Sequence, residues 1–246
     1  GEKPMDMSPN IIRIFYTGEA RKSKLDGYDL SIGFDYIDDP RYMRIPLYYL
    51  YYTNKVNTEY SRGTCHPENK KFFACFLSTK SGEGHDDWLT GCAERNKLFE
   101  NLSKYKRVQS GGKHLNNIGK IIPRSETMEF LSQCKFVIAY ENQKYPGYIT
   151  EKPFQAYFAG AIPLYYSDKT ALEDINKEAV IFQDDFASQE SMIEYIKKLD
   201  DDDNLYCKTW NQKILIEPKR NYENVKAELR GRLEKIMEEK ISRYKK

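Results

Sequence analysis

The sequence lacks a long apolar run, a paired cysteine motif and a strong excess of either charge. Its 246 residues contain no stretch near the roughly 18 apolar residues of a membrane-spanning helix and no signal-peptide pattern, so we expect a soluble protein. The 3 histidines show no metal-ligand spacing, and we expect no metal site. The net charge of +2 implies no general attraction to nucleic acid, although local basic clusters are allowed.

Cysteine is scarce and scattered along the chain. The 5 cysteines are odd in number and contain no C-x-x-C pair, so neither a structural zinc site nor a dense disulfide framework is expected. This usage favours a reducing compartment, and we expect a cytoplasmic protein, with a peripheral position at the cytosolic face of a membrane as an option. The cysteines are Cys65, Cys75, Cys92, Cys134 and Cys207.

Residues 136–168 are the most informative stretch. Phe136–Tyr140 is apolar and rich in β-forming residues, and Ala161–Tyr166 is typical of a second strand. Thr150 is a good N-cap for a helix between them, which would put Lys152 in the first turn. The stretch therefore predicts a β-α-β unit, whose helix would begin where α/β sheets bind anionic ligands.

A second helix is predicted over about residues 86–105. Its apolar positions recur at alternating steps of four and three residues, and Arg95 falls among them on the apolar face. Burying an unpaired charge is costly, so Arg95 needs a partner. A neighbouring acidic residue, a snorkelling side chain or a bound anion would each satisfy it.

Two other features have simpler interpretations. Asp200–Asp203 contains the letters D-x-D, but it follows a predicted helix, so a solvated acidic run is favoured over a metal motif. Residues 221–246 have the apolar stripe of an amphipathic helix. We expect this helix to dock on the fold, with pairing to another helix or contact with a membrane surface as alternatives.

The central stretch resembles part of a known family. Residues 141–166, ENQKYPGYITEKPFQAYFAGAIPLYY, resemble the donor-binding motif of the α-1,3/4-fucosyltransferases, inverting enzymes that move L-fucose from GDP-fucose to a sugar hydroxyl. Residues 13–49, which begin RIFYTGEARK and end RYMRIPLYY, are similar to a second block of that family. The two blocks follow the family's order, so the chain is identified as a member of this superfamily.

The resemblance implies an α/β fold with two Rossmann-like halves, of the GT-B type. Family members usually carry further strands and helices before the strand that starts near Ile11, so the N-terminal half is expected to be truncated or reduced. The resemblance suggests three parts: residues 1–65 as a reduced acceptor-side region, 66–220 as a Rossmann-like donor-binding domain, and 221–246 as the C-terminal amphipathic helix.

The resemblance also implies roles for six residues. Glu19 matches the glutamate thought to act as base, although the family's TGEN reads TGEA here. Arg95 and Lys152 would hold the donor diphosphate. Glu151 would lie near the ribose and fucose, where it could stabilise positive charge at the anomeric carbon. Two further donor contacts would be Asn142 and Tyr148.

These roles predict an enzyme that transfers L-fucose from GDP-fucose to a glycan or oligosaccharide in one displacement, with no metal or other cofactor. Two alternatives stay open: a relative that uses another nucleotide sugar, such as UDP-xylose, and a non-catalytic nucleotide- or glycan-binding domain. The expected partners are the nucleotide-sugar donor and a glycan acceptor, and no nucleic acid. The oligomeric state is not predicted.

Overall fold

The computed structural model describes residues 11–52, 62–79, 90–216 and 222–244, and the chain divides into two compact units. Unit 1 comprises residues 1–60, 145–149 and 218–246, and unit 2 comprises residues 61–144 and 150–217. The chain thus passes from unit 2 into unit 1 and back within the central motif. The predicted three-part division treats each part as continuous, whereas unit 1 is assembled from three separate segments.

Unit 2 is built on a five-stranded parallel sheet with the order β5-β4-β6-β7-β8. The chain starts at β4, adds β5 on one side and then continues through β6, β7 and β8 on the other. The direction of winding therefore reverses between β4 and β6, which is the topological switch point of a Rossmann-like sheet. The strands are β4 (Phe72–Phe76), β5 (Val108–Ser110), β6 (Cys134–Ile138), β7 (Ile162–Tyr165) and β8 (Ile181–Phe182).

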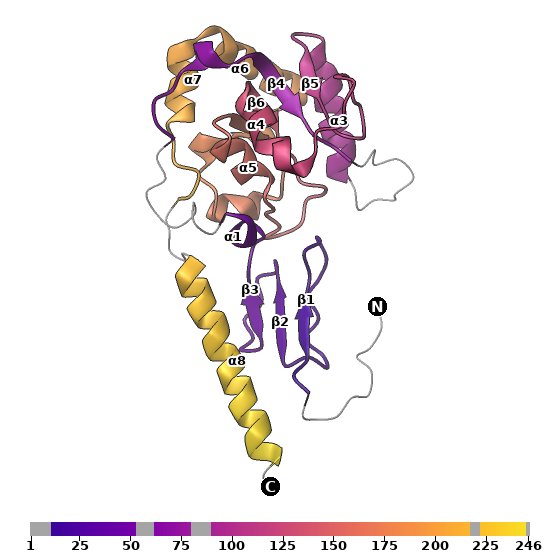
Figure 1. Cartoon of the computed structure of the whole chain (residues 1–246), viewed down its shortest axis with the longest axis vertical. Coiled ribbons are helices and arrows are strands. Elements are labelled where there is room, and N and C mark those ends of the chain that lie inside the picture. Colours follow the sequence, from indigo (N-terminus) through magenta and orange to yellow (C-terminus); the bar gives the residue numbers. More distant parts are fainter. Residues whose placement is uncertain (1–10, 53–61, 80–89, 217–221, 245–246) are drawn as a thin grey trace. The chain divides into compact units, whose positions relative to one another are not determined.

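Helices cover both faces of this sheet (Figure 1). Side chains alternate along each strand, so Ala74 and Phe76 join one buried cluster and Cys75 joins the other. The first cluster packs against α3, α6 and α7, and the second against α4 and α5. The helices are α3 (Thr90–Ser103), α4 (Thr127–Ser132), α5 (Lys152–Phe158), α6 (Gln189–Asp201) and α7 (Asp203–Trp210).

The predicted β-α-β unit is confirmed as β6, α5 and β7, with one change at the start of the helix. α5 begins at Lys152, and Glu151 occupies the N-cap position without a side-chain cap. The hydroxyl of Thr150 donates to the carboxylate of Glu141 and accepts from Lys152 N at 3.4 Å. Thr150 therefore bonds the first turn as predicted, from one residue before the N-cap position. The predicted helix over 86–105 is confirmed over α3, and its first residues lie outside the described ones.

Unit 1 contains a three-stranded parallel sheet with the order β1-β2-β3. Buried side chains such as Phe15, Leu30 and Met43 form its core. Residues 145–149 attach to this unit through a bond from Leu47 N to the last carbonyl of the segment, at 3.1 Å. The elements are β1 (Ile14–Tyr16), β2 (Leu30–Gly33), β3 (Tyr42–Arg44), α1 (Tyr48–Tyr51) and α8 (Tyr222–Tyr244).

The C-terminal helix α8 belongs to unit 1, in agreement with the expected docking, although Met237 and Ile241 of its apolar stripe are exposed. Figure 1 shows α8 running along the small sheet. Lys240 Nζ lies 2.9 Å from the carboxylate of Asp29, and Arg232 Nη1 donates to Pro40 O at 2.6 Å. Within the described ranges, no helix combines the length and apolar character needed to cross a membrane.

The acidic run Asp200–Asp203 spans the end of α6 and the start of α7. Asp200 is 9% exposed, accepts from Lys106, and lies 3.2 Å from Lys135 Nζ. Asp202 caps α7 by accepting from two backbone N–H groups. The expectation of a solvated run is therefore wrong for Asp200, because two lysines from neighbouring segments make its burial possible.

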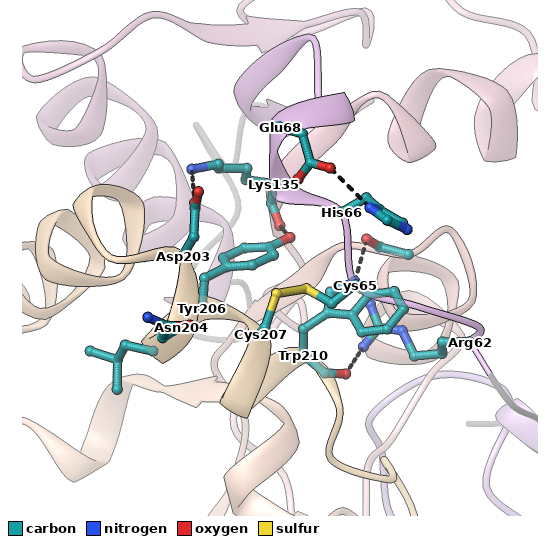
Figure 2. The surroundings of a disulfide bond; sticks show 12 residues. Arg62, Cys65, His66, Glu68, Lys135, Asp203, Asn204, Tyr206, Cys207 and Trp210 are labelled. Atoms are coloured by element: carbon teal, nitrogen blue, oxygen red, sulfur yellow. Dashed lines mark hydrogen bonds and ion pairs between the residues drawn. A yellow bond between two sulfur atoms is a disulfide. The ribbon is translucent and has the colours of Figure 1, made fainter.

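Four of the five cysteines are paired. Cys65 is bonded to Cys207 with their Cα atoms 5.7 Å apart, and a second disulfide joins Cys75 on β4 to Cys134 on the adjacent β6, leaving Cys92 buried and free. Figure 2 shows the first disulfide joining α7 to the segment before β4. The scattered spacing gave no sign of these pairs, because the fold brings together positions that lie far apart in sequence. Disulfides are rare in reducing compartments, and the cytoplasmic location stays a prediction.

Candidate functional site

A cavity of about 490 Å³ opens at the switch point of unit 2. Its walls come from the segments that follow β4 and β6, from the turn after β5, and from α3, α4 and α5. The described lining residues include four cationic side chains and a single carboxylate, Glu151. Such a lining fits an anionic ligand at the edge of an α/β sheet where ligands commonly bind. The cations are Arg95, Lys113, Arg124 and Lys152.

Arg95 lies on the buried face of α3, as its position in the apolar stripe predicts. The residue is 6% exposed, and its Nη1 donates to the side-chain oxygen of Asn142 at 3.0 Å. Burial lowers the pKa of Arg95, while the nearby Cys92 and Glu141 oppose this shift. An arginine has so high an ordinary pKa that the guanidinium stays charged at neutral pH.

Lys152 is the second cation held by defined contacts. Its ammonium Nζ lies 2.9 Å from Glu141 Oε2 and 2.9 Å from Thr150 Oγ1, with the side chain 24% exposed. Burial lowers the pKa of Lys152, but Glu141 and Glu151 raise it by more, so the net pKa is above its ordinary value. The site therefore presents a charged ammonium from the start of α5, and because α5 has only 7 residues we assign the charge to the side chain and not to a helix dipole.

Glu141 is a functional candidate that the sequence reasoning missed. It follows β6, is fully buried, and accepts hydrogen bonds from Thr150, Lys152 and Tyr165. The available signal was an acidic residue at the end of an apolar strand, a position where a carboxylate has to find donors. Lys113 follows two glycines in a turn that could approach a phosphate but is too short to be diagnostic, and nothing in the local sequence separates Arg124 from ordinary surface cations.

Asn142, a predicted donor contact, connects the two sides of the pocket. Its side chain accepts from Arg95, and its backbone oxygen accepts from Gly91 N at 2.9 Å. A Cβ atom at Gly91 would overlap the backbone of Glu141 and Asn142, so the first turn of α3 needs glycine at this close approach. The structure thus brings Arg95, Asn142, Glu151 and Lys152 together in unit 2.

The two other predicted site residues belong to unit 1. Tyr148 is 2% exposed and packs edge-to-face on Phe34, with ring centroids 4.8 Å apart. Glu19 follows the carboxyl end of β1 and is exposed, in a turn held by Thr17 Oγ1, which donates to Glu19 O at 3.0 Å and accepts from its N–H at 3.2 Å. The roles of Tyr148 and Glu19 stay predictions.

The fold and the pocket define a class: α/β proteins with Rossmann-like units and a cationic pocket at the carboxyl ends of parallel strands. Comparison with known proteins gives the family. Residues 67–242 match the profile described as glycosyltransferase family 10 (fucosyltransferase) C-term, and residues 1–51 match that of the alpha-(1,3)-fucosyltransferase FucT N-terminal domain. The chain belongs to glycosyltransferase family 10.

Individual relatives agree with this assignment. The alpha-(1,3)-fucosyltransferase FucT of Helicobacter pylori is 30% identical over 221 residues, which are 80% of this chain and 46% of that protein. A GDP-fucose protein O-fucosyltransferase 3 of Xenopus laevis is 33% identical over 126 residues, 46% of this chain and 26% of that protein. The chain therefore spans less than half the length of either relative.

Solved structures share the fold. A crystal structure of an alpha1,3-fucosyltransferase with GDP-fucose matches with a TM-score of 0.76 at 26% identity, covering 94% of this chain and 76% of that one. A crystal structure of an alpha1,3-fucosyltransferase with GDP matches with a TM-score of 0.75 at 27% identity, over 93% and 75% of the two chains. The predicted GT-B type α/β fold is confirmed.

Proposed function

We propose that the protein is an inverting glycosyltransferase that moves L-fucose from GDP-fucose to a hydroxyl group of a glycan acceptor. The observation that carries this proposal is the pocket at the switch point of unit 2. There the side chains of Arg95 and Lys152 are held in place as charged hydrogen-bond donors. Two fixed cations suit a diphosphate, since guanidinium and ammonium groups both bind phosphate oxygens strongly. Related alpha1,3-fucosyltransferases have been solved with GDP-fucose and with GDP, which supports the same donor here.

The proposed reaction is a single displacement. Glu19 takes the proton of the acceptor hydroxyl, the acceptor oxygen attacks the anomeric carbon, and the bond from that carbon to the diphosphate oxygen breaks. GDP leaves with the bonding electron pair. Arg95 and Lys152 stabilise the negative charge that develops on the diphosphate, and Glu151 stabilises the positive charge that develops on the sugar. The exposure of Glu19 at the carboxyl end of β1 is consistent with access for an acceptor.

The donor is tested by isothermal titration of the protein with GDP, GDP-fucose, UDP and UDP-xylose. We expect GDP and GDP-fucose to bind at least tenfold more tightly than the uridine nucleotides, a difference of about 1.4 kcal/mol or more. Tighter binding of UDP-xylose would overturn GDP-fucose as donor and favour the relative with another nucleotide sugar.

Catalysis is tested separately by following transfer of labelled fucose to a panel of oligosaccharides. We expect transfer to at least one sugar acceptor. A protein that binds GDP-fucose tightly but transfers the fucose neither to sugars nor to water would be a non-catalytic nucleotide-binding domain. One relative is a protein O-fucosyltransferase by name, so the panel also includes a folded protein substrate. Transfer of fucose to that protein alone would overturn the proposal that the acceptor is a glycan.

A further inference from the structure

The carboxylate of Glu141 is the most completely enclosed charge beside the pocket. Its side chain is 0% exposed. Oε1 accepts from Thr150 N at 2.8 Å and from Tyr165 OH at 3.4 Å, and Oε2 accepts from Thr150 Oγ1 at 2.7 Å and Lys152 Nζ at 2.9 Å. Both oxygens are thus used, so the orientation of the carboxylate is fixed. A buried charge is tolerated only with such partners.

We propose that Glu141 is a positioning residue, which holds the ammonium of Lys152 in place to bind the donor diphosphate. This inference rests on the proposed function, since it requires the pocket to receive a nucleoside diphosphate. Glu141 itself does not line the cavity, whereas Lys152 does. Its effect on the nucleotide is therefore exerted through Lys152.

The contacts around Lys152 form a closed triangle. Thr150 Oγ1 donates to Glu141 and accepts from Lys152 Nζ, while Lys152 Nζ also donates to Glu141. A lysine side chain otherwise has four freely rotating bonds, and ordering it on ligand binding costs conformational entropy. Because the triangle orders the ammonium before the nucleotide arrives, this cost is not incurred on binding.

The backbone around Glu141 also supports the second cation. Glu141 N donates to Tyr166 O at 2.9 Å, which fixes the segment after β6 to the end of β7. The next residue, Asn142, accepts from Arg95. Two consecutive residues therefore hold the two cations, one through a carboxylate and the other through an amide.

The negative charge of Glu141 raises the pKa of Lys152, which a neutral side chain would not do. The charged groups that face Lys152 are Glu141 after β6, Glu151 before α5 and Arg95 on α3. Burial and Arg95 lower the pKa of Lys152, and the two glutamates raise it. Without the charge of Glu141, Lys152 loses its proton at a lower pH, and binding of the diphosphate weakens from that pH upward.

The test measures the dissociation constant of GDP between pH 6.5 and 9.5 for the wild type, Glu141→Gln and Glu129→Gln. Glu129 is an exposed carboxylate on α4, so its variant controls for loss of a charge elsewhere in unit 2. The wild-type Lys152 stays protonated over this range, whereas burial without the charge of Glu141 lowers the pKa of a lysine by several units, so we expect Glu141→Gln to bind GDP roughly tenfold more weakly than the wild type at pH 9.5. All proteins are compared at the same pH, so ionisation of the nucleotide cancels.

The outcomes separate the two proposals. A wild type that binds GDP, with a pH profile that Glu141→Gln leaves unchanged or weakens equally at every pH, overturns the positioning role and leaves the proposed function standing. A wild type that does not bind GDP overturns both. If circular dichroism shows Glu141→Gln to be unfolded, Glu141→Asp replaces it, since its shorter side chain withdraws the carboxylate from Lys152. We expect a smaller shift in the same direction, and an unchanged profile overturns the inference.

Discussion

Glu19 combines exposure with a tightly bonded turn, the two properties that a base for a large acceptor needs. Its backbone is held by Thr17 while its side chain faces solvent. We expect Glu19→Gln to lower the rate of fucose transfer by about 10²- to 10⁴-fold, because the amide cannot accept the acceptor proton. GDP binding should stay within twofold of the wild type.

The matched control is Asp26→Asn, which also neutralises an exposed carboxylate in unit 1. It should transfer fucose at the rate of the wild type. Undiminished turnover in Glu19→Gln would exclude this residue as the base.

A substitution at Arg95 separates the effect of positive charge on GDP binding from the effect of guanidinium geometry. Arg95→Lys keeps the charge but loses the planar guanidinium, which bonds Asn142 and has further donors for the proposed contact with phosphate. We expect GDP affinity to fall by about 1.5–3 kcal/mol, or roughly 10- to 100-fold, in isothermal titration. Arg107→Lys, an exposed change in the same unit, should leave GDP affinity unchanged. Equal affinities for Arg95→Lys and the wild type would show that a positive charge at this position is enough for GDP binding.

Arg95 could be predicted from the sequence because a charge within an apolar stripe is visible as a break in periodicity. For Glu141 the sequence offered only its position after an apolar strand, because its burial depends on donors from Thr150, Lys152 and Tyr165. The cysteine pairs were missed for the same reason: only the order of the parallel strands brings Cys75 to Cys134, and only the packing of α7 brings Cys207 to Cys65.

At the scale of elements, the segment 145–149 depends on one glycine. Gly147 has a φ of +74°, and a Cβ there would overlap Phe34 O, while Arg44 Nη2 donates to its carbonyl at 3.2 Å. We expect Gly147→Ala to lower the free energy of unfolding by about 3 kcal/mol, measured by denaturant titration.

Gly63 provides the matched comparison, since its φ is +78° but nothing lies within 4 Å of a Cβ. Gly63→Ala should cost only the strain of the left-handed backbone, about 1 kcal/mol. Equal losses in the two variants would mean that the contact with Phe34 contributes nothing.

The elements themselves were largely predictable. The β-α-β unit, α3 and the C-terminal helix follow from apolar periodicity, which reports the faces that have to be buried. Thr150 was also predictable as a residue that bonds the first turn of α5, but its second bond, to the buried Glu141, was not. The assignment of residues 145–149 to unit 1 was also beyond local patterns, because its partners Phe34, Arg44 and Leu47 lie about a hundred positions earlier.

At the scale of the whole molecule, the two disulfides predict the number of free thiols. We expect denatured, unreduced protein purified from an oxidising compartment to contain one free thiol, that of Cys92, and reduced protein to contain five. Thiol titration with an aromatic disulfide reagent measures this. Five free thiols in the unreduced sample would contradict both pairings and would favour the predicted cytoplasmic location.

The Cys65–Cys207 bond spans 142 positions, so its loss should matter to stability. We expect Cys65→Ser combined with Cys207→Ser to lower the free energy of unfolding by about 2–5 kcal/mol under oxidising conditions. Under reducing conditions the two proteins should be nearly equally stable, which provides the control.

The three-segment construction of unit 1 also determines the order in which a ribosome can complete the protein. Strands β1, β2 and β3 are synthesised first, but their partners at residues 145–149 and in α8 emerge much later. Unit 2 needs nothing beyond residue 217 and can close before α8 has been translated. The sheet of unit 1 therefore stays incomplete until α8 has emerged, after unit 2 has been able to close, and over that interval its strands are open to chaperones and proteases.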